Sequence, residues 1–408
     1  MLLAGLSASA KTPADFNGAT PLQWSERMAD SQMARVEGKL AWKPTGGGKW
    51  DYTAGLFTLS LLKLNEQIPN PAYVAFTTNA IGSFISTDGN IEDYHPAEFQ
   101  LDAMNPGKTV IALYQLTKEE RYAKAAALLE KQFATQPRVP DGGFWHKERY
   151  TNQMWLDGLY MGATFHAACT KTFGGSPTNY DDVARQFALV KKHLYDPKTG
   201  LYYHGWDAMK IQSWANPKTG ASSNFWGRAV GWYAMALVDT LDYLPANHPA
   251  RKQLVEQIND VSKGIVKYQD AKSGVWWQVM DKGNTKGNYR EATASCMFVY
   301  ALAKAVNDGE LSDRYVPAIV KGYRGALNEF VKTNDSGALS LTSCCQVAGL
   351  GFKSMRGGPR DGSFAYYIGE PIVENDMKGI GPFILAGIEV QKLLKLPMTT
   401  KPTSPISH

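Results

Sequence analysis

Residues 141–162, DGGFWHKERYTNQMWLDGLYMG, hold side chains that could carry out acid–base chemistry on a sugar. Asp157 stands there in a run of apolar and aromatic residues. A carboxyl group in such surroundings is either paired with a cation or favoured in its protonated form, and a protonated carboxyl can act as a general acid. The alternative role of Asp157 is a helix cap. Because His146 and Lys147 lie close by in the sequence, we predict the catalytic centre of a carbohydrate-active enzyme here.

A second carboxylate, Asp102, stands in EFQLDAMNPGKTV, just before a predicted helix. Helix capping is the simpler explanation for this residue. Glycoside hydrolysis, however, commonly uses two carboxylic acids that flank the reacting bond. We therefore predict that Asp102 and Asp157 act together.

Two further motifs carry side chains suited to an acidic sugar. Trp226 and Arg228 fall in the first turn of the predicted helix in SSNFWGRAVGWYAMAL, where an arginine offers a forked donor to a carboxylate beside a stacking surface. A core tryptophan and a surface arginine are the alternative. His204 lies in the turn-rich stretch GLYYHGWD, and a lone histidine is more often a structural hydrogen-bond donor than a catalyst.

The sequence contains no complete metal-binding or cofactor-binding motif. The seven histidines of the chain show no spacing typical of a zinc site. GGGKW lacks the glycine and the Ser/Thr that a phosphate-binding loop needs at positions 43 and 50. STDGNIED lacks the spacing of a calcium loop. We expect no metal and no cofactor.

Composition sets the broad class of the protein. With 44% hydrophobic and 20% charged residues, the chain of 408 residues is typical of a globular protein with a large core. A net charge of +5 without any Lys/Arg run gives no reason to expect a nucleic-acid partner, and no stretch is long and apolar enough to predict a membrane partner. The four cysteines lack metal spacing and are interpreted as buried free thiols.

The N-terminus resembles the end of a secretory signal. A short apolar stretch is followed by Ala8-Ser9-Ala10, a small-x-small cleavage pattern, although the basic region is missing. We predict a periplasmic or secreted protein, with a cytoplasmic one as the alternative. Residues 1–20 are interpreted as the residual signal or N-terminal extension, 21–398 as one catalytic domain, and 399–408 as a C-terminal tail.

Helical periodicity dominates the chain. Apolar residues at i, i+3, i+4 and i+7, with start and stop signals, predict twelve helices. They span residues 22–36, 51–66, 71–86, 104–116, 119–134, 153–172, 180–195, 224–244, 249–269, 290–307, 312–332 and 380–395. Strand patterns are scarce, and only GVWWQVMD and LYYHGW suggest short hairpins.

Twelve helices in six sequential pairs predict a closed ring with one helix of each pair inside. The even-numbered helices are richer in Gly, Ala and aromatic residues, as an inner ring requires, whereas outer ones carry one charged face. The fold class is therefore all-α, a closed ring of six helical hairpins with a few short β-hairpins, and an open helical solenoid is the alternative. The candidate residues precede or open even-numbered helices, so they should share one end of the barrel. Residues 341–375 lack helical periodicity and are expected to wall the cleft.

These motifs together resemble glycoside hydrolase family 105, the unsaturated rhamnogalacturonyl hydrolases. The similarity runs from about Trp50 to Ile388 and rests on four strings. They are DGGFWHKERYTNQMWLDGLYMG, YYHGWDAMKIQSWANPKTG, NFWGRAVGWYAMALVDTLDYLP and RDGSFAYYIGEPIVENDMKGIGPF. The resemblance implies an (α/α)6 barrel that removes a 4,5-unsaturated galacturonyl residue from the non-reducing end of lyase-generated rhamnogalacturonan fragments.

The resemblance also implies roles for residues. Asp157 would protonate C4 of the enol ether and then act as base on the water that adds at C5, and Asp102 would be the second essential carboxylate. Lys147 would reach toward the following sugar. The predicted substrate-binding residues are Tyr52, His146, Lys147, Trp155, His204, Trp226, Arg228 and Arg360.

Two other functions remain open at this point. An unsaturated glucuronyl hydrolase acting on glycosaminoglycan, ulvan or arabinogalactan fragments would carry the same catalytic apparatus. A non-catalytic carbohydrate-binding barrel would bind the same unsaturated uronyl oligosaccharide without turnover, although a desolvated acid has little use in a pure binder. We expect the protein to be a monomer.

Overall fold

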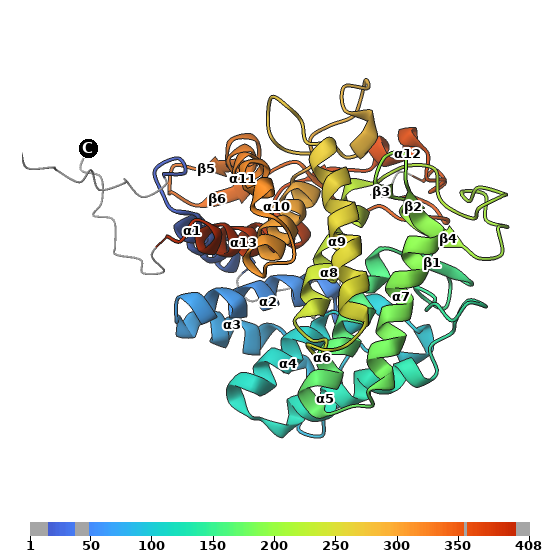
Figure 1. The fold of residues 1–408 in the computed structure, drawn as a ribbon. Coiled ribbons are helices and arrows are strands. Elements are labelled where there is room, and N and C mark those ends of the chain that lie inside the picture. Colours follow the sequence, from blue (N-terminus) through green and yellow to red (C-terminus); the bar gives the residue numbers. More distant parts are fainter. Residues whose placement is uncertain (1–14, 37–48, 355–356, 397–408) are drawn as a thin grey trace, which may run out of the picture.

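The computed structural model describes residues 15–36, 49–354 and 357–396. Six helices form an inner ring in which each packs against the next and the last packs against the first (Figure 1). They are α2 (Tyr52–Gln67), α4 (Pro106–Thr117), α6 (Thr164–Phe173), α8 (Gly227–Leu241), α10 (Ala292–Asn307) and α13 (Met377–Leu393). This closure confirms the predicted ring.

Six outer helices each cover one inner helix, which confirms the predicted (α/α)6 barrel. They are α1 (Pro21–Val36), α3 (Pro71–Ala80), α5 (Glu120–Glu130), α7 (Thr178–Leu194), α9 (Ala250–Lys267) and α11 (Val316–Phe330). Inner helices such as α10 are buried along nearly their whole length, because they face both the barrel axis and the outer ring. Outer helices such as α9 bury one face only.

Close approach of inner helices explains one of their glycines. A Cβ atom on Gly55 of α2 would lie 2.7 Å from the Cα atom of Pro106 at the start of α4. No side chain fits at that distance, so glycine allows these two helices to pack where the candidate site begins.

In the part of the chain that the structure describes, four two-stranded antiparallel sheets accompany the helices. They pair β1 (Gln153–Trp155) with β4 (Gly205–Asp207), β2 (Tyr195–Asp196) with β3 (Leu201–Tyr202), β5 (Val331–Thr333) with β6 (Leu339–Leu341), and β7 (Cys344–Cys345) with β8 (Ile372–Val373). The LYYHGW prediction is confirmed, since this stretch supplies β3 and most of β4. GVWWQVMD forms only isolated bridges, through Trp277 and Val279.

The predicted helix over residues 153–172 is wrong at its start. Gln153–Trp155 forms strand β1, because β4 offers a pairing partner that local sequence does not reveal. Helical structure begins at Asp157, passes through the π-helical turn η5 (Leu159–Ala163) and continues as α6. The segment 341–375 also contains more regular structure than expected, namely β7, β8 and the short helix α12 (Phe364–Gly369).

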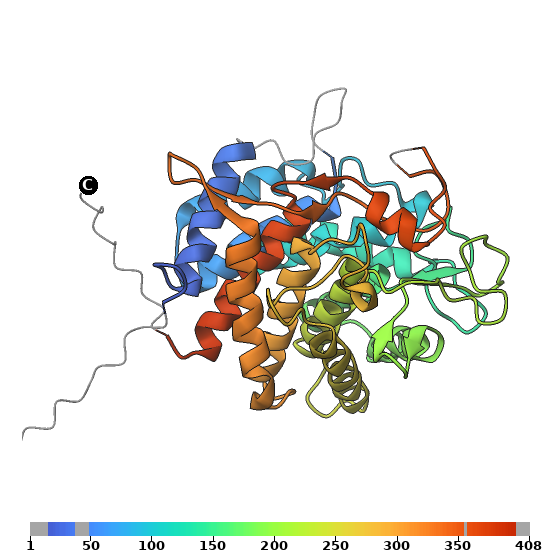
Figure 2. The ribbon, with the colours of Figure 1, turned by 90° about the horizontal axis from the view of Figure 1, so that it is seen from above.

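The inner helices begin at one end of the ring, and the irregular connections gather there. Seen from above, the orange-to-red segment with β7, β8 and α12 crosses the upper ends of the helices (Figure 2). Carboxylates cap three of these starts, with Asp51, Glu291 and Asp376 each accepting a backbone N–H of α2, α10 or α13.

Within the described ranges, no helix is long and apolar enough to cross a membrane. The predicted N-terminal extension, 1–20, lies outside the described residues up to position 14, and the predicted tail, 399–408, lies wholly outside them. The prediction of a single catalytic domain over 21–398 stays a prediction.

Candidate active site

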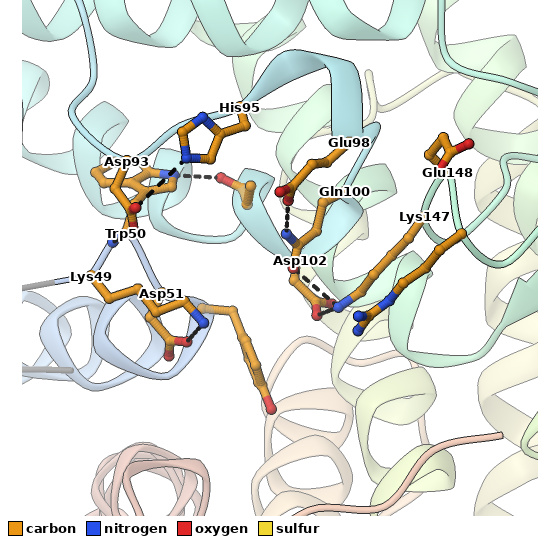
Figure 3. Close-up of a pocket in the computed structure, with 13 residues that line it drawn as sticks. Lys49, Trp50, Asp51, Asp93, His95, Glu98, Gln100, Asp102, Lys147 and Glu148 are labelled. Carbon is orange, nitrogen blue, oxygen red and sulfur yellow. Dashed lines mark hydrogen bonds and ion pairs between the residues drawn. The ribbon is translucent and has the colours of Figure 1, made fainter. Parts of the chain in front are cut away.

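A polar cavity of about 830 Å³ opens beside the start of α2 and the turn before α4 (Figure 3). Its size lies within the range of about 300–1,000 Å³ that is typical of small-ligand sites. The lining residues are Lys49, Trp50, Asp51, Tyr52, Asp93, His95, Glu98, Gln100, Asp102, Ala103, Lys147, Glu148 and Arg149. Three predicted site residues, Tyr52, Asp102 and Lys147, therefore share one cavity wall.

Asp102 is held as a carboxylate by two basic side chains. It lies in the short helical turn η3 (Leu101–Met104), with Oδ2 2.5 Å from Lys147 Nζ and Oδ1 3.3 Å from His146 Nε2. Burial alone would raise the pKa of Asp102, but Lys147 and His146 outweigh burial and hold that pKa well below its usual range. Lys147 Nζ also donates to Gln100 Oε1 at 3.0 Å, and Figure 3 shows its side chain reaching toward both partners. The contact of this ammonium with Asp102 is therefore shorter than its contact with Gln100.

Asp157 has a different kind of partner. Its Oδ2 lies 3.4 Å from His204 Nε2, and its side chain is 14% exposed. Burial lowers the pKa of His204, although Asp157 opposes this effect, so the imidazole is favoured in its neutral form. His204 Nδ1 lies 2.8 Å from the hydroxyl of Tyr367, which fixes the ring from its other side. No Lys or Arg of the described residues pairs with Asp157.

The indole of Trp155 lies between these two groups. Its ring stacks on His146 at a centroid distance of 4.8 Å and meets His204 edge-on at 5.2 Å. Tyr150 stacks on the same indole at 4.4 Å. Trp155 is buried, so it supports the two imidazoles and does not offer a stacking face to a ligand in this structure.

Trp226 and Arg228 are also buried and take part in the packing of the barrel mouth. Trp226 contacts His204 at a centroid distance of 4.7 Å. The Arg228 guanidinium lies over the Trp226 ring and donates to the carbonyl oxygen of Cys345. Burial would lower the pKa of Arg228, but Cys345 and Glu291 outweigh it and raise that pKa. The alternative of a surface arginine is wrong, because Arg228 is 1% exposed.

Arg360 lies in the connection before α12. Its Nε atom is 3.7 Å from Glu370 Oε1, and Glu370 is itself buried. The Arg360 backbone pairs with Phe352 and Gly351 across the loop. Arg360 is not on the wall of the cavity that Asp102 lines.

Sequence reasoning did not single out several residues of this region. Tyr367 stands inside the matching string RDGSFAYYIG, but nothing local indicates that its hydroxyl meets His204. Gln100 precedes Asp102 by two positions, so a closer reading of that motif could have found it. His95 and Arg149 reach the cavity wall only through the folding of their loops. Within the described residues, no cluster of three or more potential ligands could hold a metal ion.

Comparison with known families matches nearly the whole chain. The model of Glycosyl Hydrolase Family 88 matches residues 24–394. A solved structure of a family 105 glycoside hydrolase from C. acetobutylicum is 43% identical, with a TM-score of 0.85, over 90% of this chain and 99% of that one. The likeness therefore covers both the sequence and the fold.

Two curated relatives give further matches. Protein Atu3128 of Agrobacterium fabrum is 40% identical over 233 residues, which are 56% of this chain and 97% of the relative. The unsaturated rhamnogalacturonyl hydrolase YesR of Bacillus subtilis is 27% identical over 286 residues, which are 69% of this chain and 77% of YesR.

Proposed function

The chain belongs to glycosyl hydrolase family 88, and we propose that it removes an unsaturated uronyl residue from the non-reducing end of oligosaccharides produced by a polysaccharide lyase. Family membership makes the protein a glycoside hydrolase, so the alternative of a non-catalytic sugar-binding barrel is set aside. The finer proposal is a 4,5-unsaturated galacturonyl residue on a rhamnogalacturonan fragment of pectin. It is supported by the likeness to YesR and by the four matching strings.

The difference between the two carboxylates carries the proposal. Asp102 is ionised, because Lys147 and His146 hold its negative charge. Asp157 faces His204 at 3.4 Å and has no Lys or Arg partner among the described residues, so in this proposal it is the carboxyl group that carries a proton to substrate. When two carboxylic acids lie in different environments, one can donate a proton while the other stays charged.

The proposed reaction is hydration of the C4=C5 enol ether. The Asp157 carboxyl group transfers its proton to C4, and positive charge develops at C5 and the ring oxygen. Water adds at C5 while the Asp157 carboxylate takes up the proton that the water loses. The hemiketal then opens the ring and releases the next sugar. General acid–base catalysis of this kind typically contributes about 10²- to 10⁴-fold in rate.

The other residues have supporting roles in this proposal. The Asp102 carboxylate, on the cavity wall, orients the sugar ring and stabilises the positive charge that develops in it. His204 orients the Asp157 carboxyl group, with Tyr367 holding the imidazole. The Lys147 ammonium has three N–H donors, of which two are used by Asp102 and Gln100. In this proposal the third donates to a substrate oxygen.

The test is loss of the ultraviolet absorbance of the double bond in lyase digests. We expect the wild-type enzyme to bleach unsaturated rhamnogalacturonan fragments and Asp157→Asn to lose at least about 10²-fold in kcat. Asp181→Asn, the same change at a side chain that is 64% exposed, should keep full activity. Full activity of Asp157→Asn would refute its assigned role. Faster turnover of unsaturated glucuronyl fragments would replace the galacturonyl assignment with the glucuronyl one.

A further inference from the structure

Arg149 is a cation on the cavity wall that lacks an acidic partner among the described residues. The other basic groups there are paired, Lys49 with Asp51 at 3.8 Å and His95 with Asp93 at 3.7 Å, in addition to Lys147 with Asp102. The polar contact of Arg149 is with the Tyr150 hydroxyl, at 3.4 Å. Its guanidinium is therefore available to an anion that enters the cavity.

Two aromatic rings hold this guanidinium in place. Its central carbon lies 5.1 Å from the Tyr150 ring centroid and 5.4 Å from that of Phe352. Tyr150 is buried against Trp155 and is therefore a rigid support. Cation–π contacts of this kind orient an arginine without neutralising its charge.

Phe352 is an apolar side chain displayed at the surface. Its ring is 59% exposed and meets Tyr150 edge-on at 5.5 Å. Its backbone adopts a left-handed φ of 58°, a conformation that residues other than glycine rarely take. Backbone pairing of Gly351 and Phe352 with Arg360 keeps the loop in this conformation. Because the Arg149 guanidinium lies beside this ring, the loop presents an exposed apolar face next to a positive charge.

We propose that Arg149 and Phe352 form a distal subsite that binds a negatively charged sugar of the leaving oligosaccharide, beyond the sugar next to the cleaved bond. The Arg149 fork would bind the sugar carboxylate, and the Phe352 ring would stack on the sugar face. The subsite lies at the rim because Arg149 is on the cavity wall whereas Phe352 is outside it. This inference rests on the proposed function and adds that the preferred substrates are longer than a disaccharide and acidic in their leaving part.

The test compares two substrates in the same enzymes. One is an unsaturated disaccharide, which has no sugar at the distal position, and the other is a longer unsaturated oligosaccharide with a uronic acid there. For Arg149→Met and Phe352→Ala, we expect the ratio of kcat/KM for the longer substrate to that for the disaccharide to fall. The fall should be about 10- to 100-fold for Arg149→Met, as expected for a hydrogen-bonded charge. Arg185→Met, at an exposed arginine of α7, should leave the ratio unchanged.

A binding measurement separates failure of the subsite from failure of the proposed function. In an Asp157→Asn background, calorimetry would compare the longer oligosaccharide with the same compound after reduction of its carboxyl groups to alcohols. We expect Arg149→Met to weaken binding of the charged compound and to leave the reduced one unaffected. Equal binding of both compounds, with and without Arg149→Met in the Asp157→Asn background, would overturn the subsite even if turnover were normal. Loss of binding with both compounds would mean a neutral or structural role for Arg149.

Discussion

His146 and His204 contact the same indole ring, that of Trp155, and each imidazole also faces one candidate carboxylate. His146 Nε2 lies 3.3 Å from Asp102, and His204 Nε2 lies 3.4 Å from Asp157. The pairing of β1 with β4 sets this arrangement, because Trp155 lies opposite Gly205, the residue after His204. The two acids are thus linked through one rigid aromatic group.

Replacing Trp155 with leucine should lower kcat more than it raises KM. The indole keeps both imidazoles in place, so its removal loosens the two carboxylates together. Trp214→Leu is the matched control, since Trp214 is equally buried in the same small cluster but contacts neither imidazole. Full truncation of such a residue costs about 3–5 kcal/mol, so both variants should lose stability. Equal kcat in the two variants, measured below both melting temperatures, would contradict this role.

Replacing Lys147 with methionine should move the acidic limb of the kcat/KM profile to higher pH. Burial raises the pKa of Asp102, and the charge of Lys147 is the largest single influence that lowers it. Without the ammonium group the pKa of Asp102 rises, and the carboxylate becomes protonated sooner as pH falls. Lys49→Met, at a more exposed lysine on the same wall, should lower binding at most and leave the limb where it was. An unshifted limb in Lys147→Met would show that Asp102 ionisation is not required.

Replacing Tyr367 with phenylalanine should lower kcat about three- to tenfold, the worth of one hydrogen bond of about 1 kcal/mol. The tyrosine hydroxyl fixes the His204 ring at Nδ1 and so aims Nε2 at Asp157. Tyr366→Phe makes the same change one residue away, where the hydroxyl accepts from the Gly349 N–H instead. Steady-state kinetics on both variants would check the difference, and a larger loss in Tyr366→Phe would argue against the His204 contact.

Replacing Lys108 with methionine should alter stability in a pH-dependent way. Lys108 of α4 is buried. Its ammonium donates to the backbone carbonyl of Tyr160 at 3.0 Å and lies over the aromatic ring of the same residue. Burial lowers its pKa from 10.5 to about 7, so between these values the folded protein binds fewer protons than the unfolded chain. The wild-type free energy of unfolding therefore gains a rising contribution from pH 7 to 10 that Lys108→Met lacks.

Lys304→Met is the comparison variant, because the pKa of Lys304 is shifted in the opposite direction to that of Lys108. Burial would lower the pKa of Lys304, but Asp242 and Asp239 outweigh it and raise that pKa. Its stabilisation is then complete below the pKa of an unfolded lysine and does not grow between pH 7 and 10. Thermal melts should show that the free energy of unfolding of the wild type rises relative to that of Lys108→Met over this range. Its difference from that of Lys304→Met should stay constant. A constant difference for Lys108→Met would mean that burial does not lower the pKa of this lysine.

The sequence by itself determined the helices, their alternation between two rings and the end of the barrel where the site lies. These depend on local signals, since apolar periodicity, caps and breakers act within a few residues of each other. The sequence also indicated Asp102, Tyr52 and Lys147, which share one cavity wall. It did not indicate that Gln153–Trp155 is a strand, because strand β4 lies some 50 residues further along the chain.

Only the tertiary structure decided which side chains meet at the site. The contacts of His204 with Tyr367 and of Arg149 with Phe352 join residues 163 and 203 positions apart. Such contacts depend on the path of the whole chain, and no local pattern encodes them. The charge state of Asp102 is decided in the same way, because burial and two cations act on it in opposite directions and only their three-dimensional arrangement fixes which prevails.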